Sequence, residues 1–173
     1  FFFTISFILI TGFSFANRRN VIGFDILSMG VPVMQPTVQQ GDKFLVDTWI
    51  YKNDNPERGD IVAHSFDGQK GLYLNRIIAK ENDRIEIKNG TVILNGLTLT
   101  ESYVLSVNVT RPESKNMKEL IIPKGHYFVM GDNRDASFGD SRFSGTITIG
   151  NIEGKITDII SSKDKSRIGI TVR

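Results

Sequence analysis

Two Asn-Gly pairs, each placed after a run of alternating apolar and polar residues, constrain this chain more than any other feature. The stretch DRIEIKNGTVILNG covers residues 83–96, with Ile85 and Ile87 before the first pair and Val92 and Leu94 after it. Alternation with a period of two puts such side chains on one face of a strand. An Asn-Gly between two alternating runs is the strongest short-range signal for a β-hairpin. The sequence therefore predicts an antiparallel hairpin that turns at the first Asn-Gly.

Most of the remaining chain also has the composition of short strands. Stretches rich in β-branched and aromatic residues and bounded by turn residues are typical of strands. Such stretches lie within residues 42–51, 59–66, 72–79, 126–132 and 145–162. Residues 112–120 look helical or loop-like, and we mark residues 97–122 as a candidate insertion. The expected fold class is a mostly-β, antiparallel domain over residues 20–173.

The chain begins with an apolar segment rich in phenylalanine. Residues 1–16 contain no charged side chain, and Asn17, Arg18 and Arg19 follow them. A helix of this length spans about 24 Å, somewhat less than the ~30 Å hydrocarbon core of a bilayer. We interpret residues 1–19 as the end of a transmembrane helix that anchors the domain. A cleaved signal peptide and a buried core helix are the alternatives.

The composition excludes several kinds of site. The 21 Lys+Arg nearly balance the 19 Asp+Glu and form no basic cluster, so nucleic-acid binding has no support. The absence of cysteine excludes disulfides, zinc-thiolate sites and cysteine nucleophiles. His64 and His126 lie far apart in the sequence, and no metal-ligand set accompanies them. We therefore expect neither a metal nor a cofactor.

The most distinctive stretch is PKGHYFVMGDNRDASFGDSRFSG, residues 123–145. It starts as an apolar strand and continues into a loop in which acids and arginines alternate. Asp and Arg side chains in this arrangement can form ion pairs that fix the conformation of a loop. We predict a structural role for this box, which comprises Gly131, Asp132, Asn133, Arg134, Asp135, Asp140, Ser141 and Arg142.

Together with two upstream segments, this box resembles the type I signal peptidases, the membrane-bound serine proteases of the S26 family that use a Ser/Lys dyad. The family motif Ser-Met-x-Pro-Thr-Leu, followed by Gly-Asp, is matched by VMQPTVQQGD at residues 33–42. RGDIV at residues 58–62 matches a second block, and YLNRII at residues 73–78 matches the block that carries the lysine. The resemblance extends from the apolar segment to about residue 158 and implies the signal-peptidase-like β domain.

Both positions of the dyad are substituted. The position of the nucleophile holds Val33, and the position of the general base holds Asn75. The reaction needs a hydroxyl oxygen that attacks the scissile carbonyl and a neutral lysine that takes its proton. Valine has no lone pair, and asparagine is not a base near neutral pH. Loss of both members leaves only binding and any stabilisation of an oxyanion.

Other residues of the family pattern are kept. Ser137 matches the serine that supports the lysine by hydrogen bonding, although one more residue than usual separates it from Asp140. The extra residue could shift Ser137 away from Asn75. The resemblance also implies that the motif residues near the anchor contact the substrate, namely Met34, Pro36 and Thr37.

These observations favour an inactive homologue that binds signal peptides of exported preproteins at the membrane. One alternative is an active membrane serine endopeptidase whose nucleophile is relocated, for example to Ser28, or was removed by engineering. Lys70 and Lys80 lie five residues from Asn75, and an odd offset in a strand points a side chain to the opposite face. Another alternative is a non-enzymatic membrane-tethered scaffold or peptide-binding module.

The resemblance implies two partners, signal peptides and the lipid bilayer, and places the domain on the exported, extracytoplasmic side of the membrane. The positive-inside rule, by contrast, would put Arg18 and Arg19 on the cytoplasmic side. The sequence leaves this conflict open.

Overall fold

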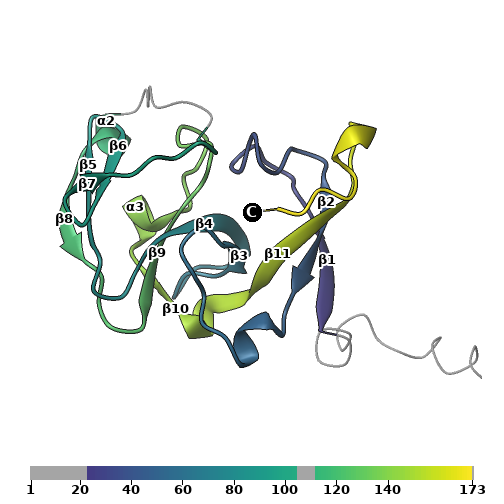
Figure 1. Cartoon of the computed structure of the whole chain (residues 1–173), viewed down its shortest axis with the longest axis horizontal. Helices are drawn as coiled ribbons and strands as arrows, with labels where there is room; N and C mark the ends of the chain where they lie inside the picture. Colours follow the sequence, from purple (N-terminus) through teal and green to yellow (C-terminus); the bar gives the residue numbers. More distant parts are fainter. Residues whose placement is uncertain (1–22, 105–111, 173) are drawn as a thin grey trace, which may run out of the picture.

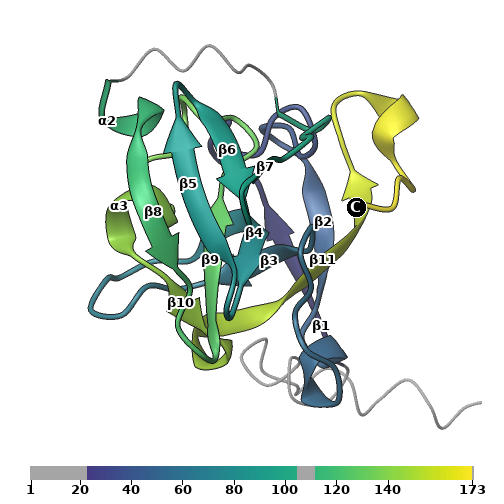
Figure 2. The same ribbon diagram turned by 60° about the vertical axis from the view of Figure 1, so that its left-hand side comes forward.

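The chain folds into two antiparallel β-sheets that together form one domain (Figures 1 and 2). The structure, a computed structural model, describes residues 23–104 and 112–172. Within these residues one sheet has seven strands in the order β1-β2-β11-β3-β4-β9-β10, and the other has four in the order β7-β6-β5-β8. The prediction of a mostly-β, antiparallel fold is confirmed.

The strands of the larger sheet come from the beginning, the middle and the end of the described chain. They are β1 (Phe24–Ser28), β2 (Lys43–Asp47), β3 (Ile61–His64), β4 (Tyr73–Lys80), β9 (His126–Met130), β10 (Ile147–Thr148) and β11 (Ile152–Ser161). The smaller sheet contains β5 (Arg84–Lys88), β6 (Thr91–Leu94), β7 (Leu97–Thr98) and β8 (Met117–Ile121). The helices described are short: η1 (Ile50–Lys52), α2 (Pro112–Lys115), α3 (Ser141–Ser144), η2 (Ile149–Asn151) and η3 (Lys165–Arg167).

The predicted hairpin is formed by β5 and β6. Lys88 pairs with Thr91, so Asn89 and Gly90 make a two-residue turn. Both turn residues have positive φ, 50° and 82°. That conformation matches the right-handed twist of the flanking strands, and asparagine and glycine adopt it most readily. The alternating apolar side chains of this hairpin are buried between the two sheets.

The loop after β1 is held by the hydrophobic core. Met34 and Val38 are fully buried in a cluster with Phe44 and Val46 of β2 and Ile156 of β11. The loop is also closed by backbone hydrogen bonds, for instance from the amide of Val38 to the carbonyl of Met34. Buried contacts of this kind leave the segment little freedom, which fixes the position of the residues between them.

Two predictions concern segments at the limits of the described chain. The predicted anchor, residues 1–19, lies outside the described residues. Among residues 23–104 and 112–172, no helix is both long and apolar enough to cross a membrane. Residues 97–122 contribute β7 and β8 to the smaller sheet, and whether they are an insertion stays a prediction. The stretch 112–120, expected to be helical or loop-like, contains the short helix α2 and most of strand β8.

Gly154 of β11 allows a close approach to β2. A Cβ atom at Gly154 would lie 2.4 Å from the carbonyl oxygen of Asp47 and 2.8 Å from Cγ1 of Val46. We expect Gly154→Ala to lower the free energy of unfolding by about 1–3 kcal/mol, as other over-packed sites do. Urea unfolding followed by circular dichroism measures this. Gly150→Ala is the control, because its Cβ would meet only Thr148 Oγ1, at 3.6 Å. Equal stability of the two variants would contradict the prediction.

Candidate active site

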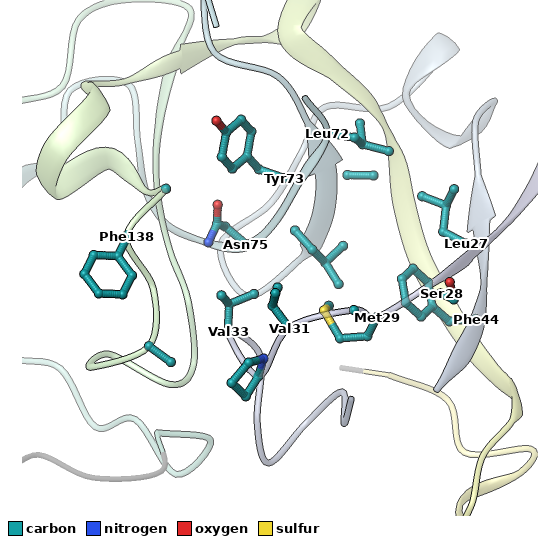
Figure 3. Close-up of a pocket in the computed structure, with 16 residues that line it drawn as sticks. Leu27, Ser28, Met29, Val31, Val33, Phe44, Leu72, Tyr73, Asn75 and Phe138 are labelled. Atoms are coloured by element: carbon teal, nitrogen blue, oxygen red, sulfur yellow. The ribbon is translucent and has the colours of Figure 1, made fainter. Parts of the chain in front are cut away.

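A groove of about 830 Å³ lies between the end of β1 and the start of β4 (Figure 3). The loop that follows β9 forms its third side. The lining residues are Leu27, Ser28, Met29, Gly30, Val31, Pro32, Val33, Phe44, Ala63, Leu72, Tyr73, Leu74, Asn75, Ala136, Phe138 and Gly139. Among the described residues that line the groove, none is Asp, Glu, Lys, Arg or His, so the groove is largely apolar and carries no charged side chain.

The structure brings together the three residues expected at the reactive centre. Val33 and Asn75 both line the groove, and Ser137 lies behind Asn75, with 3.5 Å between Asn75 Nδ2 and Ser137 Oγ. The additional residue before Asp140 therefore does not separate Ser137 from Asn75. Gly131 makes this arrangement possible, because a Cβ at Gly131 would lie 2.5 Å from Ser137 Cβ and 2.7 Å from the carbonyl oxygen of Val33.

Asn75 belongs to a buried chain of hydrogen bonds. His64 Nε2 lies 2.8 Å from Asn75 Oδ1, and the hydroxyl of Ser137 donates to Asp140 Oδ2 at 2.7 Å. Arg142 completes the chain by an ion pair with Asp140. All of these side chains are shielded from water in the described structure. These polar side chains are thus bonded to one another rather than to solvent, and only Nη1 of Arg142 is left without a partner among them.

His64 was not among the predicted site residues. The sequence shows it only as a lone histidine in an apolar strand, whereas its role follows from strand pairing. Val62 of β3 is the register partner of Asn75 on β4, so His64, two residues further along, faces the same side. The sequence did predict both strands. Their pairing in the correct register would have identified the contact between His64 and Asn75.

The imidazole of His64 is held in an apolar, aromatic environment. Its ring stacks on Tyr73 with 5.9 Å between centroids and meets the edge of Phe66 at 4.9 Å. Burial lowers the pKa of His64 below its ordinary value, although its hydrogen bonds to Asn75 and to the carbonyl of Ser65, and the charge of Asp140, act in the opposite direction. A neutral imidazole has one ring proton, and the shorter contact, 2.8 Å from Nε2 to Asn75 Oδ1 against 3.3 Å from Nδ1 to the carbonyl of Ser65, assigns that proton to Nε2.

An ion pair between Arg76 and Asp132 joins three segments around the site. Arg76 Nε and Nη2 donate to the two carboxylate oxygens of Asp132 at 2.8 and 2.7 Å, and both side chains are almost completely buried. Arg76 also donates to the carbonyl of Gly59 and lies over the ring of Tyr103. Thr37 donates its hydroxyl to Asp132. This bidentate pair thus connects the loop after β1 with β4 and with the loop after β9.

The remaining residues of the predicted box hold the loop after β9. Arg134 pairs with Glu101, and the amide of Asn133 donates to the carbonyl of Val33 at 3.0 Å. Asp140 caps α3 by accepting a hydrogen bond from the amide of Arg142. Two more box residues complete the loop: the buried Ser141 accepts from the amide of Val129, and Asp135 lies half-buried in the turn.

The predicted substrate contacts are positioned differently. Met34 is fully buried, Thr37 is bonded to Asp132, and Pro36 is exposed. None of the three is among the described groove-lining residues, so their direct contact with a substrate stays a prediction. In this structure Met34, Pro36 and Thr37 belong to the loop after β1, and other residues of this loop form one wall of the groove.

The fold, the groove and the box define the class of protein. The chain belongs to the family described as signal peptidase, peptidase S26, whose profile matches residues 3–160. The resemblance to type I signal peptidases is therefore confirmed. Signal peptidase I of Enterococcus faecalis has a similar crystal structure, with a TM-score of 0.52 and 28% sequence identity over 60% of this chain and 98% of that chain.

Curated relatives agree with this assignment. Signal peptidase IB of Staphylococcus aureus is 34% identical over 139 residues, which cover 72% of this chain and 71% of the relative. Signal peptidase I of Bacillus amyloliquefaciens is 34% identical over 129 residues, 70% of this chain and 65% of the relative. Thylakoidal processing peptidase 1 of Arabidopsis thaliana is 32% identical over 133 residues, but the match spans only 37% of its length.

A substitution in the Arg76–Asp132 pair tests how much this ion pair contributes to the stability of the fold. We expect Arg76→Met to lower the free energy of unfolding by about 3–5 kcal/mol, because it leaves the Asp132 carboxylate buried without a counter-charge. Lys80→Met is the matched control, since Lys80 pairs with Glu57 on the surface and such pairs contribute about 0–1 kcal/mol. Urea unfolding of both variants measures the difference. A similar loss in both would show that the buried pair is not the organising contact.

The buried His64 makes stability depend on pH. In the unfolded chain His64 takes up a proton near its ordinary pKa of 6.5, whereas the folded state resists protonation until lower pH. The free energy of unfolding should therefore fall as pH drops below 6.5, by at most about 1.4 kcal/mol per pH unit from this group. His64→Gln, which keeps a donor for Asn75, should show a smaller slope between pH 7.5 and 5.5. An unchanged slope would mean that His64 does not contribute.

Proposed function

We propose that this protein is a membrane-attached, catalytically inactive member of the signal peptidase family that binds signal-peptide-like segments of exported preproteins in its groove. One observation carries the proposal. The two side chains at the positions where the family's dyad is expected, Val33 and Asn75, both line the groove, and neither can attack a carbonyl or accept a proton from a nucleophile. The protein thus has a groove that can hold a peptide but lacks the nucleophile and the general base that would cleave it.

The backbone on both sides of the groove suits an extended ligand. The ladder between β4 and β9 begins at Arg76, so in the described structure Tyr73–Asn75 pair only with β3. On the other side, β1 is an edge strand that pairs with β2. A peptide added as a strand between these edges gains main-chain hydrogen bonds, and such binding needs no nucleophile.

The side chains of the groove favour an apolar segment. The rim carries three exposed hydrophobic residues on three different segments, Val31, Leu72 and Phe138, with exposed fractions of 54%, 44% and 60%. Exposed apolar side chains that gather around a cleft are typical of binding sites. Signal peptides are apolar, and a membrane anchor in residues 1–19 would present this groove near the bilayer on the exported side.

A relocated catalytic pair finds no support among the described residues. Ser28 lines the groove but lies at the opposite end from Asn75 (Figure 3). Lys80 is bound to Glu57 at the surface, and no lysine is among the described groove-lining residues. Lys43 is the register partner of Ser28, but both residues are exposed to solvent and Lys43 does not line the groove, so the described residues give Ser28 no water-shielded lysine of the kind that the reaction needs. The scaffold alternative differs from the proposal in one respect, because a scaffold need not bind a signal peptide.

Restoration of the dyad is the direct test. The full chain in detergent should not cleave a preprotein with a small-x-small site, yet should bind the corresponding signal peptide. The double variant Val33→Ser, Asn75→Lys should cleave at least about a hundredfold faster than the unaltered chain, because a positioned general base contributes on this scale or more. Gel analysis of the products measures the rate. Each single variant should remain inactive, since each lacks one half of the pair.

The controls separate the alternatives. Robust cleavage by the unaltered chain that survives Val33→Ala would overturn the proposal, and its loss in Ser28→Ala would then identify a relocated nucleophile. Absence of peptide binding would favour the scaffold alternative.

A further inference from the structure

The amide of Asn75 has one orientation, which a chain of hydrogen bonds imposes. The Asp140 carboxylate, paired with Arg142, only accepts hydrogen bonds, so the single hydroxyl proton of Ser137 points to it. The lone pairs of Ser137 Oγ then face Asn75, which must present its Nδ2 donor there. Asn75 Oδ1 is thereby turned towards His64, whose Nε2 carries the proton between them. A flipped amide would place two acceptors against each other at Ser137.

This orientation leaves donor capacity on Asn75. A side-chain amide has two N–H groups, and the described structure provides one acceptor for them, Ser137 Oγ, at the long distance of 3.5 Å. Asn75 lines the groove although only 1% of its surface is exposed. A buried donor with a missing partner is unfavourable, so an oxygen acceptor brought into the groove by a ligand would complete its bonding.

The groove offers that acceptor no positive charge. Its described lining residues include no cation. Arg142, the cation in the chain of hydrogen bonds, donates to Asp140 and to the backbone carbonyls of Arg134 and Ser137; its buried Nη1 has no partner among the described residues, but Arg142 does not line the groove. A carboxylate that entered this apolar groove would lose its water without gaining a counter-charge, which costs far more than the burial of a neutral carbonyl.

We infer that the groove discriminates between intact and cleaved segments: Asn75 donates to the neutral carbonyl of a peptide bond, and a segment that ends there in a free carboxylate is rejected. The hydrogen bond from Ser137 to Asp140 fixes the orientation of this amide. The inference rests on the proposed function, because it takes the groove as the peptide site. A protein of this kind would retain uncleaved segments and exclude the carboxyl-terminal ends that an active peptidase produces.

Three peptides test this preference. The first is a short N-acetylated peptide of neutral residues that ends in Ala-Leu-Ala with a free carboxylate, the second is its C-terminal amide, and the third continues past the same alanine with further neutral residues. Each carries the same fluorophore near its N-terminus, and fluorescence anisotropy with the full chain in detergent gives the dissociation constants. We expect the amide and the extended peptide to bind at least about tenfold more tightly than the carboxylate, a difference of ~1.4 kcal/mol.

Two variants test whether Asn75 is the cause of this preference. Asn75→Lys adds a cation at this position and should reduce or reverse the preference. Leu72→Ala, a change on the rim, should weaken all three peptides by a similar factor and leave the preference unchanged. Equal binding of carboxylate and amide by the unaltered chain, or tighter binding of the carboxylate, would overturn this inference alone. Failure of all three peptides to bind would overturn the proposed function and this inference with it.

Discussion

The bidentate ion pair between Arg76 and Asp132 is the contact on which the rest of the site depends. Removed from water, each charge would be costly alone, and together they are stable because the guanidinium matches the carboxylate and the remaining hydrogen-bonding groups have partners in Gly59 and Thr37. The pair joins three segments that are distant in the sequence. The groove walls are positioned by this contact, and neither Val33 nor Asn75 takes part in it.

If Val33 and Asn75 occupy the positions of the dyad, as proposed, this independence explains how the framework of a peptidase can persist without it. The ion pairs of the box and the buried Met34 hold the loops from behind, whereas the side chains of Val33 and Asn75 line the groove and take no part in these ion pairs. Asn75 has neighbours that suit an amide, because His64 and Ser137 bond to its oxygen and its nitrogen. Under the proposed function, the site keeps its order by these hydrogen bonds and ion pairs alone.

The parts of this structure that were predictable from the sequence are those encoded locally. Asn89 and Gly90 specify a turn by their own conformational preferences, and the box of acids and arginines is contiguous in the chain. Strand β8 was not predicted, because at the edge of its sheet most of its residues are exposed and it shows no alternation. Strand β1 was missed for a related reason: its Asp25 is buried while Phe24 and Ile26 are exposed. The contact of His64 with Asn75 depends on the register between β3 and β4, which the local sequence pattern does not determine.

Two strand edges beside the groove, those of β1 and of Tyr73–Asn75 in β4, have no ladder partner among residues 23–104 and 112–172, and this has a consequence for the free protein. If the groove binds an extended segment, as proposed, that segment would add a strand between the end of β1 and the start of β4. The ligand would then be a structural element as well as a partner, and its binding energy would add to the stability of the fold by mass action. The empty protein and the loaded protein would differ in rigidity around the groove, so occupancy could be read from the unfolding temperature alone.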